Sequence, residues 1–123
     1  MLQILLVTTD PEPLSEFLTT LTEDREVRLQ YAASGVEALE QVRATPPHLV
    51  IIDRTVSDCT PFDLVSSVLS TNAMVNTAVV STLSEEAFHE AYEGLGVLDH
   101  LSPPLGPEDG RQILEKLRRI LGL

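Results

Sequence analysis

The segment His48–Asp53, with the sequence HLVIID, decides the fold of this chain. After its first residue the segment is an unbroken apolar run rich in β-branched side chains. Such a run is typical of a central strand that is covered on both faces, as in the parallel sheets of α/β proteins. The run ends in Asp53, so the sequence predicts a carboxylate at the carboxyl end of a buried strand.

Four further strands are predicted on either side of this segment. Leu2–Thr8 is a short apolar run, Thr77–Ser81 is expected to be a buried strand, and Val97–Leu101 is expected to be the last strand. Residues 27–31 alternate apolar and polar side chains, which is the period of a strand with one exposed face. Strands are therefore expected at intervals along the whole chain.

A helix is predicted after each strand. Most of the starts are marked by a capping side chain that is followed by a proline or an acidic residue. The expected helices begin at Asp10-Pro11, at Ser34 (ending near Arg43), at Thr60-Pro61, at Ser84 (ending near Gly94) and at Glu108 (ending at Leu121, before Gly122).

This alternation of strands and helices predicts the α/β class, because parallel neighbouring strands need helical crossovers. The 123 residues are enough for a single domain, residues 1–123, but too few for an eight-fold barrel. We therefore expect a doubly wound, five-stranded parallel sheet with the strand order 2-1-3-4-5. This arrangement is a three-layer, flavodoxin-like sandwich.

In this topology the strand order reverses between the first and third strands, and the crevice at their carboxyl ends is the expected functional site. Thr8–Asp10 and Asp53 follow these two strands. Ser81, Thr82 and the loop Ser102–Pro104 are expected to flank them. Asp53 has a second interpretation as a solvated strand end. Ser81 and Thr82 have a second one as hydroxyls that satisfy nearby backbone groups.

The charge of the chain limits its partners. With 8 basic and 19 acidic side chains, the formal net charge of −11 repels nucleic acids and anionic membranes. The single cysteine, Cys59, allows no intrachain disulfide. No apolar run is long enough to span a bilayer and no signal sequence opens the chain, so we expect a cytoplasmic protein. Dinucleotide, triphosphate and hydrolase motifs are absent, which argues against an enzyme.

Three segments of the chain, Leu5–Glu12, His48–Asp53 and Val79–Thr82, resemble a response-regulator receiver domain of two-component signalling. The resemblance extends over the whole chain and implies a receiver-like fold. It implies that a histidine kinase phosphorylates Asp53 and that the hydroxyl of Ser81, beside Thr82, senses the phosphoryl group. The implied function is a phosphorelay module whose partners are a sensor histidine kinase, an output domain or both.

Several positions that matter in this family carry other residues here. The acidic pair that holds Mg²⁺ falls on Thr8 and Thr9. The lysine that precedes a cis proline falls on Pro103, so a cis bond is predicted at Pro104. The aromatic switch residue of the fifth strand falls on His100. The resemblance therefore implies a degenerate site, in which the acceptor reacts slowly and Mg²⁺ binds weakly or not at all.

Asp10 is the one acidic side chain left on the loop after the first strand. It is expected to cap the following helix, or to bind a cation weakly together with Asp53 and the degenerate position Thr9. The hydroxyls of Thr8 and Thr9 are neutral donors, and an alternative is that they hydrogen-bond to Asp53 directly.

The resemblance places a docking surface on the helix that begins at Ser84, the strand Val97–Leu101 and the helix Glu108–Leu121. This surface is expected to bind a partner protein or a second copy of the chain. It is expected to display Glu90, Glu93, Asp99, His100, Arg111 and Arg118. Two alternatives remain: docking without phosphorylation, and a flavodoxin-like small-molecule site. The second needs a hydroxyl- and glycine-rich phosphate loop after the first strand, where Pro11 lies.

Overall fold

The computed structural model describes all 123 residues and contains one sheet of five strands. The strands are β1 (Leu2–Val7), β2 (Val27–Ala32), β3 (Leu49–Ile52), β4 (Asn76–Val80) and β5 (Asp99–Leu101). Their order is β2-β1-β3-β4-β5, and every neighbouring pair is parallel. The predicted α/β class and doubly wound topology are confirmed.

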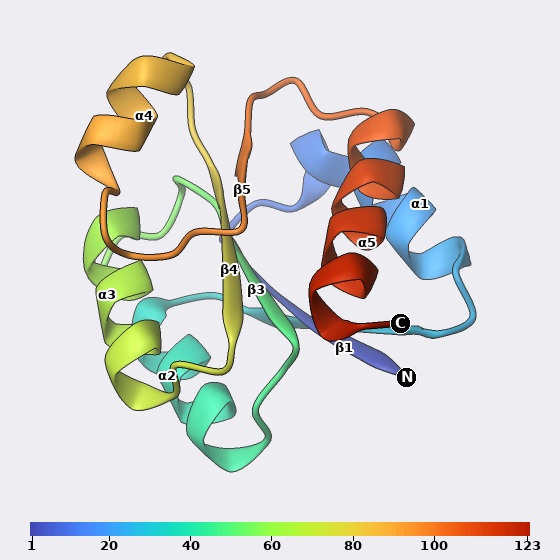
Figure 1. Cartoon of the computed structure of the whole chain (residues 1–123), viewed down its shortest axis with the longest axis horizontal. Helices are drawn as coiled ribbons and strands as arrows, with labels where there is room; N and C mark the ends of the chain where they lie inside the picture. The colour runs from blue at the N-terminus through green and yellow to red at the C-terminus, as the bar shows by residue number, and fades with distance from the viewer.

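Helices cover both faces of this sheet. They are α1 (Ser15–Glu23), which follows the 3-10 turn η1 (Glu12–Leu14), α2 (Gly35–Ala44), α3 (Pro61–Thr71), α4 (Glu85–Ala91) and α5 (Pro107–Leu121). In Figure 1, α1 and α5 lie together on one side of the sheet, and α2, α3 and α4 lie on the other. The fold is thus the predicted three-layer sandwich. No helix is both long enough and apolar enough to cross a membrane.

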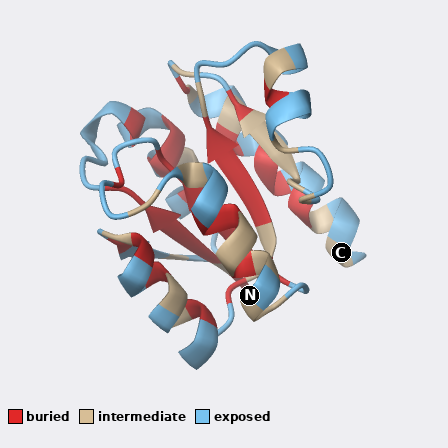
Figure 2. Ribbon diagram, turned by 90° about the vertical axis from the view of Figure 1, so that its left-hand side faces the viewer, coloured by how far each residue is buried: buried red, intermediate tan, exposed pale blue.

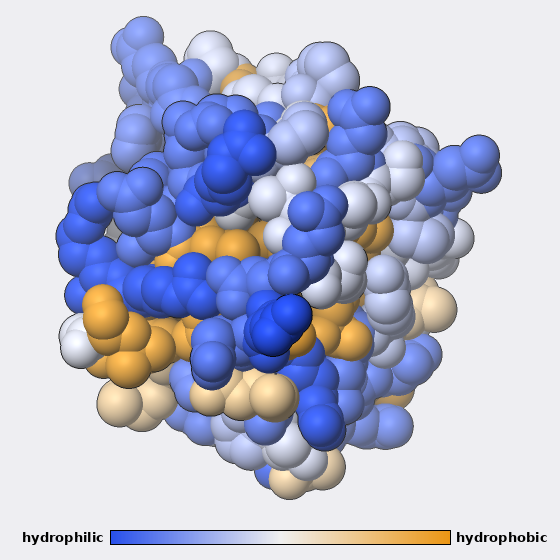
Figure 3. All heavy atoms as spheres, turned by 90° about the vertical axis from the view of Figure 1, so that its right-hand side faces the viewer, coloured by the Kyte–Doolittle hydropathy of each residue, from blue (hydrophilic) through white to orange (hydrophobic).

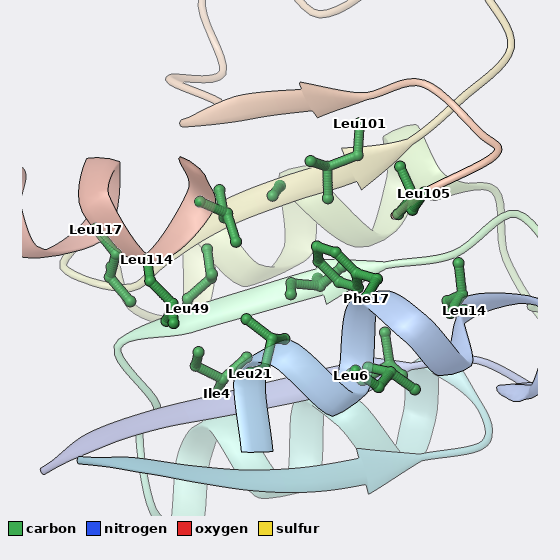
Figure 4. Close-up of a cluster of buried hydrophobic side chains, with 14 of the residues drawn as sticks. Ile4, Leu6, Leu14, Phe17, Leu21, Leu49, Leu101, Leu105, Leu114 and Leu117 are labelled. Carbon is green, nitrogen blue, oxygen red and sulfur yellow. The ribbon is translucent and has the colours of Figure 1, made fainter. Parts of the chain in front are cut away.

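The sheet separates two hydrophobic cores, because successive side chains of a strand point to opposite faces. Along β1, Ile4 and Leu6 enter the core beneath α1 and α5, while Leu5 and Val7 enter the core beneath α2 and α3. Figure 4 shows the first core, in which Phe17 of α1 is fully buried. Figure 2 shows the molecule from the side of α2, α3 and α4. These helices expose their outer surfaces and bury the surfaces that face the sheet.

The layer formed by α1 and α5 is tightly packed. At Gly110 of α5 an added Cβ would lie 2.9 Å from the Cβ of Thr20, so only glycine fits between the two helices. Figure 3 shows the molecule from this side: hydrophilic side chains cover most of the surface, and hydrophobic ones are visible in patches between them. This is the surface expected of a chain with a high net charge.

Three of the predicted helix starts are confirmed by their caps. The side chains of Ser34, Thr60 and Ser84 each accept the backbone N–H of the residue three positions later, at 3.0 to 3.1 Å. The predicted cap at Asp10 is wrong, because the chain enters η1 with Pro11 as its N-cap and no side chain caps it. This segment contains two prolines, which lack an N–H, so few amides are available for a carboxylate to bond.

The segment between α4 and β5 differs most from the prediction. α4 ends at Ala91 rather than near Gly94, and β5 begins at Asp99 rather than at Val97. Gly94 and Gly96 have φ angles of 84° and 63°, in the left-handed region that glycine adopts without strain. The chain therefore turns here instead of continuing the helix.

The register of the sheet brings the ends of β1 and β3 together. Val7 is opposite Ile52, and the N–H of Asp53 donates to the carbonyl of Val7 at 2.9 Å. The N–H of Thr8 donates to the carbonyl of Ala32 at 3.0 Å. Thr8 and Asp53 therefore leave the sheet as neighbours.

Candidate functional site

Asp53 lies where the sequence predicts it, at the carboxyl end of β3, and only 5% of the residue is exposed. Its Oδ1 accepts the N–H of Arg54 at 2.8 Å, and its Oδ2 accepts the hydroxyl of Thr8 at 2.7 Å. Hydrogen bonds to a charged acceptor are among the stronger ones in proteins. The carboxylate is therefore held in one orientation by groups on both of its oxygens.

Three threonines connect the loops that follow β1 and β3. The hydroxyl of Thr55 accepts the N–H of Thr9 at 2.9 Å and lies 3.1 Å from the hydroxyl of Thr8. The hydroxyl of Thr9 donates to the carbonyl of Thr55 at 3.2 Å and not to Asp53. The alternative in which both threonines bond to the carboxylate is thus confirmed for Thr8 and wrong for Thr9.

A pocket of about 380 Å³ opens beside Asp53. Its walls come from the loops after β1, β3, β4 and β5 and include Asp10, Arg54, Thr82 and Pro103. Arg54 is the only basic residue in these walls. The predicted crevice is therefore present, and an anion bound there would meet one cation.

Nothing in the sequence singles out Thr55 or Arg54, although both line this pocket. Their only signal is that they follow Asp53 directly in the chain. Loop residues at such positions often face solvent without any role, so the signal is weak. What makes Thr55 important is its contact with two threonines of another loop, and a sequence pattern does not reveal that contact.

The donor set beside Asp53 does not fit a divalent cation. Mg²⁺ prefers carboxylate and other oxygen ligands in an octahedral arrangement. Here both oxygens of Asp53 already accept hydrogen bonds, and the neighbours Thr8 and Thr9 carry no charge. Asp10 lines the pocket but is exposed. No group of three histidine, cysteine, aspartate or glutamate side chains in the structure is arranged to hold a metal ion.

The flanking residues lie close to their predicted places but differ in what they contact. Thr82 lines the pocket, whereas the hydroxyl of Ser81 accepts the N–H of Leu83 at 3.0 Å. Ser81 therefore bonds to a nearby backbone group, which is the second interpretation that the sequence allowed for it. The peptide bond between Pro103 and Pro104 is cis, as predicted.

The predicted docking surface on α4, β5 and α5 differs from expectation at three residues. His100 is not displayed, because its ring stacks on an aromatic side chain of α4 and only 4% of the side chain is exposed. Arg118 turns toward α1 and donates to Asp24 at 2.7 Å, which lowers the pKa of that carboxyl. Asp99 is half-buried and accepts a hydrogen bond from Lys116 at 2.9 Å. The exposed residues of this surface are Glu90, Glu93 and Arg111.

Asp58 fixes the loop after β3 to the start of α2. Its carboxylate accepts the N–H of Gly35 at 2.9 Å and that of Val36 at 3.1 Å. Both bonds lower the pKa of the Asp58 carboxyl, and the bond from Gly35 has the larger effect. Next to it, burial and the charge of Asp58 raise the pKa of the Cys59 thiol, so this cysteine is a poor nucleophile at neutral pH.

Replacement of Asp58 by asparagine is expected to lower the melting temperature at pH 7. Asparagine has one side-chain oxygen, so it accepts only one of the two bonds that the two carboxylate oxygens accept from Gly35 and Val36, and it lacks the negative charge that a helix N-terminus favours. Because folding lowers the pKa of Asp58, its carboxylate stabilises the fold above the ordinary pKa of aspartate. That contribution is lost as the pH falls through the lowered pKa of Asp58 in the folded protein.

The difference in melting temperature between this variant and the wild type should therefore shrink below about pH 4, as followed by thermal unfolding from neutral to acidic pH. Glu40→Gln, on the exposed side of α2, is the matched control and should behave as the wild type. Equal losses in the two variants would contradict the role of Asp58.

No protein-family model matches the sequence, and no curated protein is significantly similar to it. Solved structures are similar in fold. A CheY-like response regulator receiver domain from Methanospirillum hungatei JF-1 has a TM-score of 0.84 at 19% identity, covering 99% of this chain and 98% of that one. A two-component response regulator from Clostridium difficile has a TM-score of 0.84 at 16% identity, covering both chains fully. The HemR receiver domain from Leptospira biflexa has a TM-score of 0.76 at 24% identity, covering 100% of this chain and 96% of that one.

These similarities extend over nearly the full length of each chain. They therefore include the loops that carry Thr8, Asp53 and Pro103 as well as the sheet itself. The chain has the fold of a response-regulator receiver domain.

Proposed function

We propose that this chain is the receiver module of a two-component phosphorelay, that Asp53 accepts the phosphoryl group, and that the module signals through protein–protein contacts. The observation that carries the proposal is the position of Asp53, a buried carboxylate at the end of β3 beside a pocket. No other strand of the sheet is followed directly by a carboxylate. The proposed partners are a sensor histidine kinase and an output domain, in the cytoplasm. No catalytic activity is proposed beyond the chain's own phosphorylation.

The proposed transfer forms a bond between a carboxylate oxygen of Asp53 and the phosphorus of the donor. The bond between that phosphorus and its leaving group breaks, and the leaving group keeps the electron pair. The leaving group is a histidine nitrogen in a kinase and a carboxylate in a small acyl phosphate. The product is an acyl phosphate on Asp53. The attacking oxygen first gives up the hydrogen bond that it accepts, from Thr8 at Oδ2 or from Arg54 at Oδ1.

The surroundings of Asp53 predict that this transfer is slow. Phosphoryl transfer is accelerated by positioning and by groups that neutralise charge on the phosphoryl oxygens. The groups near Asp53 are neutral hydroxyls, a backbone amide and one exposed cation, Arg54. The site therefore holds the acceptor but supplies little charge to the group that is transferred.

The test is treatment of the full chain with acetyl phosphate, with and without Mg²⁺, followed by intact mass spectrometry. We expect slow addition of one phosphoryl group at a rate that Mg²⁺ changes little. Asp53→Asn should abolish the addition, and the control Asp10→Asn, in the wall of the same pocket, should retain it. Labelling that persists in Asp53→Asn would contradict the choice of acceptor. Fast, saturable, Mg²⁺-dependent labelling would contradict the weakened site.

The neutral surroundings of Asp53 also support a second candidate function, docking to a partner without phosphorylation. It predicts that acetyl phosphate leaves the mass unchanged, even after long incubation, while the chain still binds its partner. A small-molecule site of the flavodoxin kind has less support, because the loop after β1 continues into Pro11 and Pro13 instead of a glycine-rich turn.

A further inference from the structure

The imidazole of His100 is enclosed by α4 and by the loop after β4. Its Nδ1 lies 3.0 Å from a carboxylate oxygen of Glu85, the first residue of α4. Its Nε2 lies 3.0 Å from the backbone carbonyl of Ser81. The ring stacks on Phe88 with a centroid distance of 4.1 Å and an interplanar angle of 1°, and Phe88 stacks in turn on Tyr92.

Both partners of this ring are hydrogen-bond acceptors. A backbone carbonyl only accepts, and so does an ionised carboxylate. A neutral imidazole has one N–H and one lone pair, so it satisfies one of the two contacts and directs a lone pair at the other. Only the doubly protonated imidazolium donates to Glu85 and Ser81 at the same time.

We propose that protonation of His100 links the first turn of α4 to β5, so that the position of α4 responds to pH. In the protonated state the ring bonds to both Glu85 and the carbonyl of Ser81. When the proton leaves, the bond to the Ser81 carbonyl is kept, because that carbonyl belongs to the backbone beside a ring with almost no exposure. The bond to Glu85 is lost, because that side chain is 68% exposed and water replaces the histidine as its partner.

Other charged groups near the ring are already paired or point to solvent. The titratable groups that line the same pocket are Glu85, His89, Glu90, Tyr92 and Glu93 of the α4 segment, Asp99 of β5 and Lys116 of α5, while β4 contributes none; Glu90 and Glu93 are exposed. Asp99 is bound by Lys116 at 2.9 Å, so its charge is largely neutralised. His89 lies 3.9 Å from the second oxygen of Glu85 and is 80% exposed. Glu85 is therefore the group that distinguishes the two protonation states of His100.

The proposed link acts on the segment that carries Ser81 and begins α4, and it does not require phosphorylation of Asp53. A link that needs the imidazolium is complete at the acidic end of the range in which histidine titrates, about pH 5 to 8, and is lost as the pH rises through it. A partner that binds α4 would thus meet a more fixed helix at the lower pH.

The experiment is nuclear magnetic resonance of the ¹⁵N-labelled full chain between about pH 5 and pH 8, with the imidazole nitrogens and backbone amides observed together. At the lower pH we expect protons on both ring nitrogens of His100. His48, whose Nδ1 accepts the N–H of Gln3 at 2.9 Å, is observed in the same spectra for comparison. As His100 loses its proton, the amides of residues 84–88 should shift along the same titration curve.

Glu85→Gln removes the charge that favours the imidazolium, and Glu86→Gln is the matched control in the same exposed turn. In Glu85→Gln the titration midpoint of His100 should fall by about half a pH unit, as expected for a partly exposed ion pair. In Glu86→Gln it should stay at the wild-type value. A single proton on His100 at the lower pH, equal shifts in both variants, or unmoved amides at residues 84–88 would each overturn the proposal.

Discussion

The triple variant Thr8→Asp, Thr9→Asp, Pro103→Lys should make the labelling of Asp53 at least about tenfold faster in Mg²⁺ than without it. Each added carboxylate attracts a divalent cation by about 4 kcal/mol per unit charge pair at 4 Å and an effective dielectric constant near 20. Hydration of the ion cancels most of this gross attraction. A remainder of about 1.4 kcal/mol is already a factor of ten in rate or affinity.

A second readout of this variant does not depend on phosphorylation. Thr8 and Asp53 are in contact, so aspartate at position 8 places two buried carboxylates side by side and lowers the melting temperature in the absence of metal. Mg²⁺ should restore part of that loss in the triple variant and leave the wild type unchanged. The matched control Thr8→Asn, Thr9→Asn, Pro103→Gln has similar shapes without the charges. A triple variant indifferent to Mg²⁺ in both assays would contradict the proposal that these three positions weaken the site.

The Thr8→Val variant should lose about 2 kcal/mol of unfolding free energy at pH 7. Valine keeps the shape of threonine but removes the hydroxyl that donates to Oδ2 of Asp53 at 2.7 Å. A hydrogen bond to a charged group contributes about 1.5–3 kcal/mol, and a carboxylate with 5% exposure has little water to replace the lost donor. The other donor to Oδ2, the hydroxyl of Thr55, lies 3.5 Å away and makes a weaker bond.

The control for this variant is Thr9→Val, since Thr9 is exposed and its hydroxyl bonds only to a loop carbonyl at 3.2 Å. It should cost less than about 0.5 kcal/mol, as do most surface substitutions. Urea unfolding of the two variants and the wild type measures both values. Losses of similar size in the two variants would mean that Thr8 stabilises the loops rather than the carboxylate.

The fold of this chain could be predicted because its signals are local and repeated. The apolar run of β3 and the capping residues Ser34, Thr60 and Ser84 each specify their own element, and the alternation of elements then leaves few topologies. The position of Asp53 followed from the end of β3 alone. The failure at Asp10 has the same local origin, because the prolines that suggested a helix start also removed the amides that a cap would bond.

The contacts within the site could not be predicted, because they join segments far apart in the chain. Thr55 contacts Thr8 and Thr9 only after β1 and β3 have paired, and no periodic pattern in the sequence predicts these contacts. His100 occupies a short edge strand, where exposure is the usual expectation. It is buried because Phe88 and Glu85 of a separate helix cover it.

The position of β3 in the sheet has a consequence for local unfolding. β3 lies between β1 and β4, and all of its residues are buried, whereas β5 is a three-residue strand at the edge of the sheet. Opening of β3 requires the loss of both cores, while opening of β5 and the seven-residue α4 removes only an outer side chain from each, Leu101 from one core and Phe88 from the other. The amide of Asp53, bonded to the carbonyl of Val7, is therefore expected to exchange with solvent only when the whole domain unfolds. The α4 and β5 amides should exchange through smaller and more frequent openings, so the surface proposed to contact partners can fluctuate while Asp53, the proposed acceptor, stays fixed.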